Sequence, residues 1–390
     1  MLACTMSIPL ISAPQLASAS CLNASMPNHI DQACSRCGDA CPAEAIQYTS
    51  SQATNPVTDP SSAHLPLLDT SACTGCTACV SICPTDALRH AAVKPAELVR
   101  QSIKLVQQGN THIHATCSAS NHQRADLRLP CHAAWSPLLL ASLAAEGVRS
   151  LNLDGMEQCH DCPMQFGSKI MQQTEKDYTT LNHALGVRLR ITSQSIPSEV
   201  RIDTKPAGEP ERRAFFRNLM PSLAQSAATA TAQIAQAAQQ SMEQASLEGD
   251  NGTTKKPTKR PSPLPVRLQL FLRALPKLQS NFTPVPATPS LPLGSIQADA
   301  RCNACGECVE QCPTSALYLK EFGANKILEF KANTCIGCSH CIDCCPEHAI
   351  EPLPGISLPA ILTGKARPLV MVTGSNIKAQ EHKLDNDRKE

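Results

Sequence analysis

The central part of the chain, residues 94–195, alternates between two hydrophobic periods. Apolar residues recur at helical spacing over 95–107, 136–145 and 167–185, with prolines at the first two starts and glycines after the last two ends. Proline fits the first turn of a helix, and glycine its end. Short apolar runs between these stretches predict strands at 112–116, 127–129, 148–153 and 187–191. Helices that alternate with short strands favour a parallel sheet with crossover connections.

The region that follows lacks this alternation. Residues 196–295 are rich in Ala, Gln, Ser and Pro and predict a linker with short helices, one of them over 211–220. Within this linker, residues 264–278 are mostly apolar with interspersed Arg and Lys. We expect this element to dock on a partner, to lie at a membrane interface, or to pack on the chain's own cysteine-rich module. No run of 18 apolar residues occurs, so peripheral contact is the only membrane contact expected.

The amino-acid composition indicates metal sites in place of one large hydrophobic core. The 390 residues include 22 Cys and 31 Pro, but only one Trp and three Tyr. So few aromatic residues argue against one large core, and small domains without such a core can use metal clusters as staples. A net charge of +1 does not indicate the basic surface that binds nucleic acid. Residues 1–20 contain no Lys or Arg and hence no export signal, so we expect a cytoplasmic protein whose cysteines bind metal.

Two cysteine runs, at 302–313 and 335–346, share the pattern C-x2-C-x2-C-x3-C-P. Bacterial ferredoxins use this run for [4Fe–4S] clusters, and in paired runs the fourth thiolate binds the other cluster. Two zinc sites or a disulfide framework are the alternatives, but zinc needs only two short cysteine pairs. The segment resembles two-cluster bacterial ferredoxins at every ligand position. The predicted ligand sets are Cys302, Cys305, Cys308 and Cys345 for one cluster, and Cys335, Cys338, Cys341 and Cys312 for the second.

The N-terminal part of the chain carries one complete run and one run that lacks its first cysteine. In the incomplete run, Asp31 stands at the position of the missing ligand. Asp31 and Cys21 are the two candidates for that role, and the softness of a thiolate favours Cys21 at an iron site. The predicted ligand sets are Cys73, Cys76, Cys79 and Cys41 for one cluster, and Cys34, Cys37, Cys83 and Cys21 for the other.

Four further cysteines follow the predicted central strands: Cys117 the first strand, Cys131 the second, and Cys159 and Cys162 the third. Ligands bind at the carboxyl ends of strands in open parallel sheets, so these thiols should converge. Such a set suits a [2Fe–2S] cluster, a further cubane or zinc, and free or disulfide-bonded thiols are the remaining alternative. Four histidines near the same strand ends are alternative ligands: His112, His114, His132 and His160.

This central region resembles the iron–sulfur subunit of methyl-viologen-reducing hydrogenase. The shared features are a cysteine after a strand, a helix–Gly–strand unit, and a loop with a close cysteine pair, over LPCHAAWSPLLLASLAAEGVRSLNLDGMEQCHDCP. The resemblance implies that the protein docks beside a larger oxidoreductase. The whole arrangement also resembles 4Fe–4S proteins associated with formate dehydrogenase.

These sites predict an iron–sulfur electron-transfer protein with four [4Fe–4S] clusters and a central site that holds one [2Fe–2S] cluster or zinc. Sites saturated by thiolates leave no position for a substrate, and no glycine-rich dinucleotide loop accompanies them. We therefore expect a polyferredoxin without a substrate site, which relays single electrons between a soluble oxidoreductase and another redox carrier. The alternatives are a cluster carrier or maturation factor and a thiol-based redox sensor.

The expected fold is multi-domain α+β, in which two ferredoxin-like modules flank a small α/β domain with a parallel sheet. The expected divisions are an N-terminal extension (1–20), a ferredoxin-like module with an irregular first motif (21–93), the α/β thiol-rich domain (94–195), the Ala/Gln- and Pro-rich linker (196–295), a two-[4Fe–4S] ferredoxin domain (296–355) and a C-terminal tail (356–390).

Overall fold

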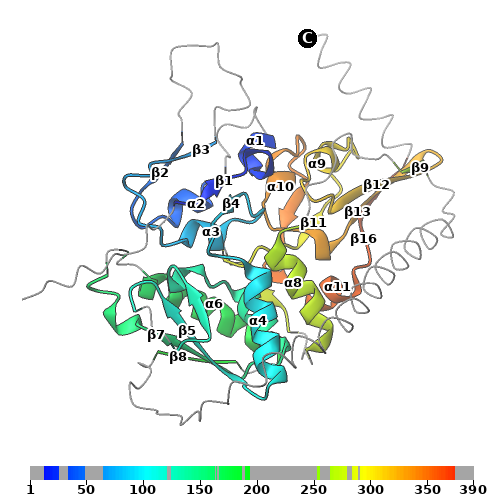
Figure 1. The fold of residues 1–390 in the computed structure, drawn as a ribbon. Coiled ribbons are helices and arrows are strands. Elements are labelled where there is room, and N and C mark those ends of the chain that lie inside the picture. The colour runs from blue at the N-terminus through cyan, green and yellow to red at the C-terminus, as the bar shows by residue number, and fades with distance from the viewer. Residues whose placement is uncertain are drawn as a thin grey trace, which may run out of the picture. The chain divides into compact units, whose positions relative to one another are not determined.

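The computed structural model describes most of the chain on both sides of a long gap (Figure 1). The described residues are 13–25, 34–48, 65–120, 124–162, 164, 167–186, 189–193, 253–254, 264–278, 283–288 and 290–373. Asp31 and the predicted helix at 211–220 lie outside them. The described residues before 194 and after 263 contact one another and belong to one compact unit.

A four-stranded parallel sheet organises residues 94–193. Its strand order is β6-β5-β7-β8, and all three pairings are parallel, which is the pairing that alternating helices and strands predict. The first strand lies between the second and the third, so the carboxyl ends of these three strands meet at one edge. The strands are β5 (His112–Cys117), β6 (Leu127–Leu129), β7 (Ser150–Asp154) and β8 (Arg190–Thr192).

Helix α4 precedes the first strand, α5 connects β6 to β7, and α6 connects β7 to β8, all with bounds close to the predicted ones. Figure 1 shows α4 and α6 beside the sheet. Proline stands at the first turn of α4 and of α5, where its missing N–H is not needed. Gly147 ends the second helix with a φ of +95°, a conformation that glycine adopts without a steric penalty. The elements are α4 (Pro95–Gln107), η4 (His132–Ala134), α5 (Pro137–Ala145), η5 (Met156–Gln158) and α6 (Gly167–Leu185).

Helix α8 (Val266–Ala274) and the 3-10 turn η6 (Leu275–Lys277) come from the range predicted as linker, after the two-residue strand β9 (Thr253–Thr254). The helix packs against α4 and α5, and Leu268 and Phe271 are fully buried. Burial of such side chains stabilises by about 1.5–3 kcal/mol each, so α8 satisfies its apolar face on the central domain. None of the helices in the described part of the chain is long and apolar enough to cross a bilayer.

The N-terminal module combines two antiparallel strand pairs with short helices. Strand β1 pairs with β4 and so brings together the two ends of the module, while β2, which follows the first cysteine run, pairs with β3, which precedes the second. The elements are β1 (Gln15–Leu16), η1 (Ser18–Ser20), α1 (Leu22–Ser25), α2 (Arg36–Asp39), β2 (Ile46–Tyr48), β3 (Pro66–Leu68), α3 (Ala78–Ile82) and β4 (Leu88–Arg89).

The C-terminal module repeats this plan with longer strands. Strand β11 pairs with β14, while β12 and β13 form a hairpin of six residue pairs that β16 extends. Strand β10 pairs with β15, and the predicted tail contributes α11 and β16. The elements are β10 (Val285–Pro286), β11 (Ile296–Ala298), α9 (Glu307–Glu310), β12 (Leu317–Phe322), β13 (Asn325–Phe330), η7 (Ala332–Thr334), α10 (His340–Asp343), β14 (Ile350–Pro352), β15 (Gly355–Ile356), α11 (Leu358–Thr363) and β16 (Arg367–Val372).

Candidate iron–sulfur centres

Four Cys-Pro pairs begin the same turn, two in each cysteine-rich module. The residue three positions after each cysteine has a φ between 47° and 52°, and the next backbone N–H donates to the cysteine Sγ. Such a donor favours the thiolate over the thiol and fixes the direction of the sulfur. The four bonds are Ala45 N to Cys41 Sγ (3.3 Å), Ala87 N to Cys83 Sγ (3.2 Å), Ala316 N to Cys312 Sγ (3.1 Å) and Ala349 N to Cys345 Sγ (3.3 Å).

The first group of thiols, site 1, lines a single cavity of the C-terminal module. Burial raises the pKa of Cys308, and the nearby thiols of Cys344 and Cys305 raise it further. Cys305 is exposed, and the carboxylates of Glu307 and Glu347 stand at the same cavity. Site 1 consists of Cys302, Cys305, Cys308 and Cys345, the set expected from the exchange of fourth cysteines.

Site 2 groups the remaining cysteines of the paired runs: Cys312, Cys335, Cys338 and Cys341. Burial raises the pKa of Cys338 to about 12, and the thiols of Cys335 and Cys312 act in the same direction. A Cβ on Gly294 would lie 2.8 Å from Cys335 Sγ, so only glycine leaves room beside this sulfur. Cys344, which belongs to neither predicted set, is a buried thiol whose pKa burial raises to about 12.

Site 3 contains the incomplete run, and Cys21 joins it. Burial raises the pKa of Cys21, and the thiols of Cys83 and Cys34 raise it further. The buried Asn23 holds the two segments together, because its Oδ1 accepts the Cys34 N–H (2.7 Å) and its Nδ2 donates to the Cys34 carbonyl (3.1 Å). The structure therefore brings together Cys21, Cys34, Cys37 and Cys83.

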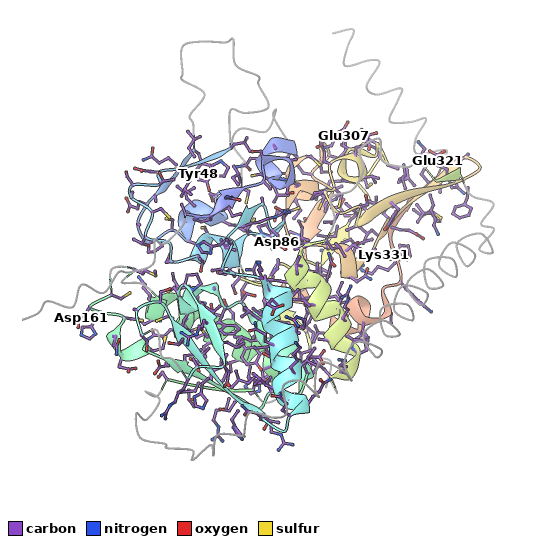
Figure 2. All side chains as sticks on the ribbon, in the orientation of Figure 1. Tyr48, Asp86, Asp161, Glu307, Glu321 and Lys331 are labelled. Atoms are coloured by element: carbon purple, nitrogen blue, oxygen red, sulfur yellow. The ribbon has the colours of Figure 1, made fainter. Side chains whose placement is uncertain are left out.

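Tyr48, which Figure 2 labels, adds a hydroxyl to site 3. Its Oη lies 3.1 Å from Cys37 Sγ, accepts the Gly38 N–H (3.0 Å) and lies 3.1 Å from the Ser35 carbonyl. The phenol has one proton, which it donates to the Ser35 carbonyl, and a metal-bound Cys37 thiolate, which can only accept, would compete for the same proton. Neither Asn23 nor Tyr48 carries a signal in the sequence that would have marked it as part of a metal site.

Site 4 combines the complete N-terminal run with the fourth cysteine of the incomplete one. Burial raises the pKa of Cys76, and the thiols of Cys41 and Cys73 raise it further. The pKa of Cys79 is raised more strongly, again through burial first and then through its neighbouring thiols. The group is Cys41, Cys73, Cys76 and Cys79, as the exchange of fourth cysteines predicts.

Site 5 lies at the carboxyl ends of the central strands, where Cys117, Cys131, Cys159 and Cys162 line one cavity. Two glycines form part of the wall. A Cβ on Gly167 would lie 2.8 Å from Cys131 Sγ, and one on Gly155 would lie 3.5 Å from Cys117 Sγ. The absence of side chains at these two glycines leaves space between the sulfurs, as an inorganic core would require.

Of the four histidines considered at site 5, His132 lines the cavity. Its Nε2 lies 2.9 Å from the Asp154 carbonyl, and burial lowers the pKa of the ring. His114 lies instead beside Asn152 of the neighbouring strand, and His160 forms an exposed ion pair with Asp161. His112 is an exposed residue at the start of β5.

The thiol groups share local features that suit an inorganic cluster. Glycines stand directly beside a cysteine sulfur at sites 2 and 5, and backbone N–H groups point at the fourth sulfur in sites 1 to 4.

Neighbouring thiol groups approach one another in the order in which we number them. Burial raises the pKa of one thiol at each contact, and a thiol of the adjacent site raises it further. These pairs are Cys308 with Cys341 between sites 1 and 2, Cys37 with Cys79 between sites 3 and 4, and Cys76 with Cys131 between sites 4 and 5.

Arg36 links site 2 to site 3. Its Nη2 donates to the Gly337 carbonyl at 2.5 Å, across the boundary between the two cysteine-rich modules. Burial raises the pKa values of Cys34 in site 3 and Cys338 in site 2, and the charge of Arg36 opposes the rise at both thiols. The arginine is thus shared electrostatically by the two sites.

Comparison with known families agrees with this geometry. Residues 32–88 match a family described as "4Fe-4S dicluster domain", and residues 301–349 match a second family of the same description. These two segments are 4Fe–4S dicluster domains. They contain the complete cysteine runs and the incomplete one, whereas Cys21 lies outside the first match. No curated protein and no solved structure matches the chain. Two 4Fe–4S dicluster domains indicate an iron–sulfur electron-transfer protein.

Proposed function

We propose that the protein is a polyferredoxin that relays single electrons between an oxidoreductase and another redox carrier, without a substrate site of its own. Sites 1 to 4 would each hold one [4Fe–4S] cluster. Site 5 would hold a further iron–sulfur cluster. When bound, these clusters supply one-electron oxidation and reduction. The chain's own part is to hold the sulfurs, exclude water from them and set the charge around each site.

The observation that carries the proposal is the unbroken series of thiol groups. Each group lies close enough to the next for the charge of a thiol to act on it, or is joined to it through Arg36. Metal sites with a purely structural role would not need to lie near one another, because each stabilises its own loops wherever it lies. A relay needs it, because the transferred charge must pass from one site to its neighbour.

The two ends of the series differ in chemistry, and we assign a partner to each. At site 1 the exposed Cys305 lies among acidic side chains, which favours a redox carrier with a basic surface. At site 5, Cys162 is half-buried next to the exposed pair His160–Asp161. The resemblance of the central region to a hydrogenase subunit supports a docking role there, beside an oxidoreductase of the formate dehydrogenase or hydrogenase type.

Metal analysis tests the proposal first. Anaerobically purified full-length protein should contain about 16 iron for four cubanes, or about 18 to 20 if site 5 holds a binuclear cluster or a further cubane. One zinc with about 16 iron would place zinc at site 5 and remove it from the relay. Dithionite reduction should produce the low-temperature EPR signals of reduced cubanes, and a well-folded protein without them would end the proposal.

The rate of cluster transfer to an acceptor protein distinguishes an electron relay from a cluster carrier. An electron relay should exchange electrons with viologen faster than it donates iron and sulfide to an apo-ferredoxin. The reverse order of rates would favour a cluster carrier or maturation factor. A change in partner binding on thiol oxidation, without steady electron flow, would favour a redox sensor.

A further inference from the structure

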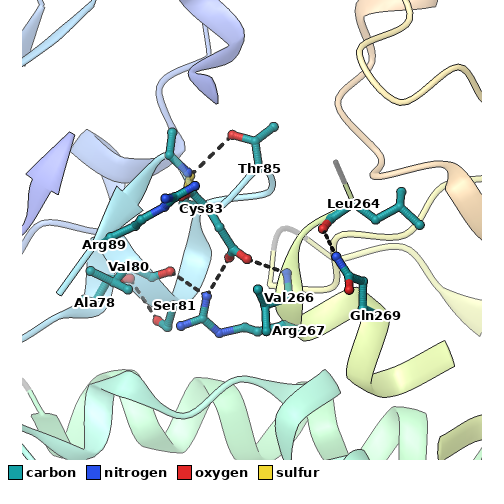
Figure 3. A network of polar contacts seen from close by, with 12 residues as sticks. Ala78, Val80, Ser81, Cys83, Thr85, Arg89, Leu264, Val266, Arg267 and Gln269 are labelled. Atoms are coloured by element: carbon teal, nitrogen blue, oxygen red, sulfur yellow. Dashed lines mark hydrogen bonds and ion pairs between the residues drawn. The ribbon is translucent and has the colours of Figure 1, made fainter. Parts of the chain in front are cut away.

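Arg267 of helix α8 lies beside site 3 and binds Asp86, which precedes it by 181 positions in the chain (Figure 3). The Nη1 of Arg267 donates to Asp86 Oδ1 and to the Val80 carbonyl, both at 3.0 Å. Val80 and Asp86 stand three residues before and three residues after Cys83. The guanidinium therefore spans the turn that presents the Cys83 sulfur to site 3.

This guanidinium is buried with less negative charge around it than a buried cation normally needs. Arg267 is only 4 % exposed, and its Nε and Nη2 have no hydrogen-bond partner among the described residues. Removal of a charge from water is costly unless the charge is paired, and each buried donor without an acceptor adds to this cost. Burial lowers the pKa of Arg267, whereas the charges of Asp86 and Cys83 oppose that change.

Asp86 does not balance this positive charge by itself. Its Oδ2 also accepts the Val266 N–H at 2.5 Å, at the N-terminus of α8. The N-terminus of a helix carries a partial positive charge. One carboxylate thus faces both a guanidinium and a helix N-terminus, and the remaining negative charge nearby is that of the site 3 sulfurs when they are ionised.

We propose that Arg267 is a positioning residue that raises the reduction potential of the cluster at site 3, which makes site 3 easier to reduce than site 1. The proposal rests on the assignment of a cluster to site 3 in the proposed function. Reduction adds negative charge to a cluster, so a fixed cation nearby favours the reduced form. At site 1, Asp299 is paired with Arg301, so their charges largely cancel. The carboxylates of Glu307 and Glu347 line the cavity and act in the opposite direction to Arg267.

An EPR-monitored redox titration of the metal-loaded, full-length protein tests this proposal. Arg267→Gln removes the charge but keeps a polar side chain, so one midpoint potential should fall and the others should stay. The reduced-to-oxidised ratio of that cluster at a fixed potential should change about tenfold or more, which corresponds to about 59 mV. Asp86→Asn removes the opposing charge and should raise the same midpoint. Arg273→Gln, an exposed position on the same helix, is the matched control and should move none.

Because Arg267→Gln should lower the midpoint potential and Asp86→Asn should raise it, the pair of variants distinguishes an effect of charge from an effect of packing. If Arg267 were only a strut between α8 and the N-terminal module, Arg267→Gln would lower the unfolding temperature and leave every midpoint unchanged. That result, in a variant with full iron content, overturns the proposal.

If Arg267→Gln loses the site 3 iron, the midpoint potentials of Arg267→Lys and Asp86→Asn test the proposal in its place. The lysine variant must keep the wild-type midpoint, and the asparagine variant must raise it. A wild-type protein that lacks a fourth cubane contradicts the proposed function, whereas unchanged midpoints in loaded variants contradict the role of Arg267 alone.

Discussion

The two cysteine-rich modules share one plan but differ in how the first thiol of a run is supplied. In the C-terminal module all eight predicted ligands lie within 44 residues, from Cys302 to Cys345. In the N-terminal module one position of the pattern is taken by Asp31, and Cys21 reaches the site from a separate segment that Asn23 fastens to Cys34. A cluster site therefore depends on where sulfurs meet, and a contiguous run is only one way to bring them together.

The backbone of the loops shows the same difference. Each complete run has two left-handed residues, one before and one after its second cysteine: Gly75 and Thr77, Ala304 and Gly306, Gly337 and Ser339. The corresponding residue of the incomplete run, Ser35, has a φ of −104°, and the chain enters helix α2 at once. Left-handed residues wrap a loop around a core. The incomplete run needs less of this wrapping, because another segment covers that side of the site.

The largest expected effect tests the source of the fourth ligand at site 3. Cys21→Ser should remove one cubane, about four iron per chain, because the remaining three thiols cannot complete the site. Asp31→Asn is the matched control and should keep all iron. Iron and sulfide analysis with EPR spin quantitation measures both. Loss of a cubane in the asparagine variant, with a normal content in the serine variant, would reverse the assignment.

The second effect concerns the side chain that joins the two segments of site 3. Asn23→Ala breaks two partly buried hydrogen bonds to the Cys34 backbone and leaves the Cys34 N–H without this acceptor, so the free energy of unfolding should fall by about 2 kcal/mol. Thermal unfolding and the rate of iron loss to a chelator measure the change. Asn303→Ala, which removes two exposed bonds in a complete run, to the Cys305 N–H (3.0 Å) and to Glu347 (3.1 Å), should cost less than about 1 kcal/mol. Equal losses in both variants would contradict the special role of Asn23.

A smaller effect is expected at the hydroxyl beside Cys37. Tyr48→Phe removes the hydroxyl whose proton this sulfur and the Ser35 carbonyl share, so the midpoint potential of site 3 should fall, since a hydrogen bond to a ligand sulfur favours the reduced form. A bond worth about 1 kcal/mol corresponds to about 40 mV for one electron. In the C-terminal module the matching position is Leu319, which stands at the site 1 cavity and has no hydroxyl. Tyr318→Phe serves as the control, and an equal shift there would show that the effect is not specific to Cys37.

The smallest effect belongs to the longer hairpin of the C-terminal module. Lys320→Gln removes a cross-strand ion pair with Glu329 at 3.4 Å, which should lower the free energy of unfolding by about 0.5 kcal/mol. The effect should shrink further as salt is added, because partly exposed pairs are screened. Denaturant unfolding at two salt concentrations measures it. A loss above about 2 kcal/mol would mean that this hairpin, and not the cluster sites, dominates the stability of the module.

Much of the site could be predicted from the sequence because the relevant information is local. The spacing within 302–313, 335–346 and 73–84 determines which thiols share a loop, and the exchange of fourth cysteines follows from the paired arrangement. The bounds of α4 and α6 were likewise predictable, because the hydrophobic period, a proline and a glycine mark them within the helices themselves.

Contacts between distant segments were not predictable in the same way. The sequence favoured Cys21 over Asp31 through ligand softness alone, and it offered no reason for Asn23 to hold the two segments together. It placed residues 264–278 in a linker with three destinations open. The structure packs α8 on the central domain, and it brings Arg267 to the turn after Cys83.

By itself, then, the sequence determined the chemistry of this protein, since ligand type and spacing within a loop are set by a few neighbouring residues. The tertiary structure decided the order of the five thiol groups, the bridge at Arg36, and the buried charge beside site 3. The reason is physical. Burial and long-range packing depend on the sum of many weak contacts across the whole chain, and no short stretch of residues encodes that sum.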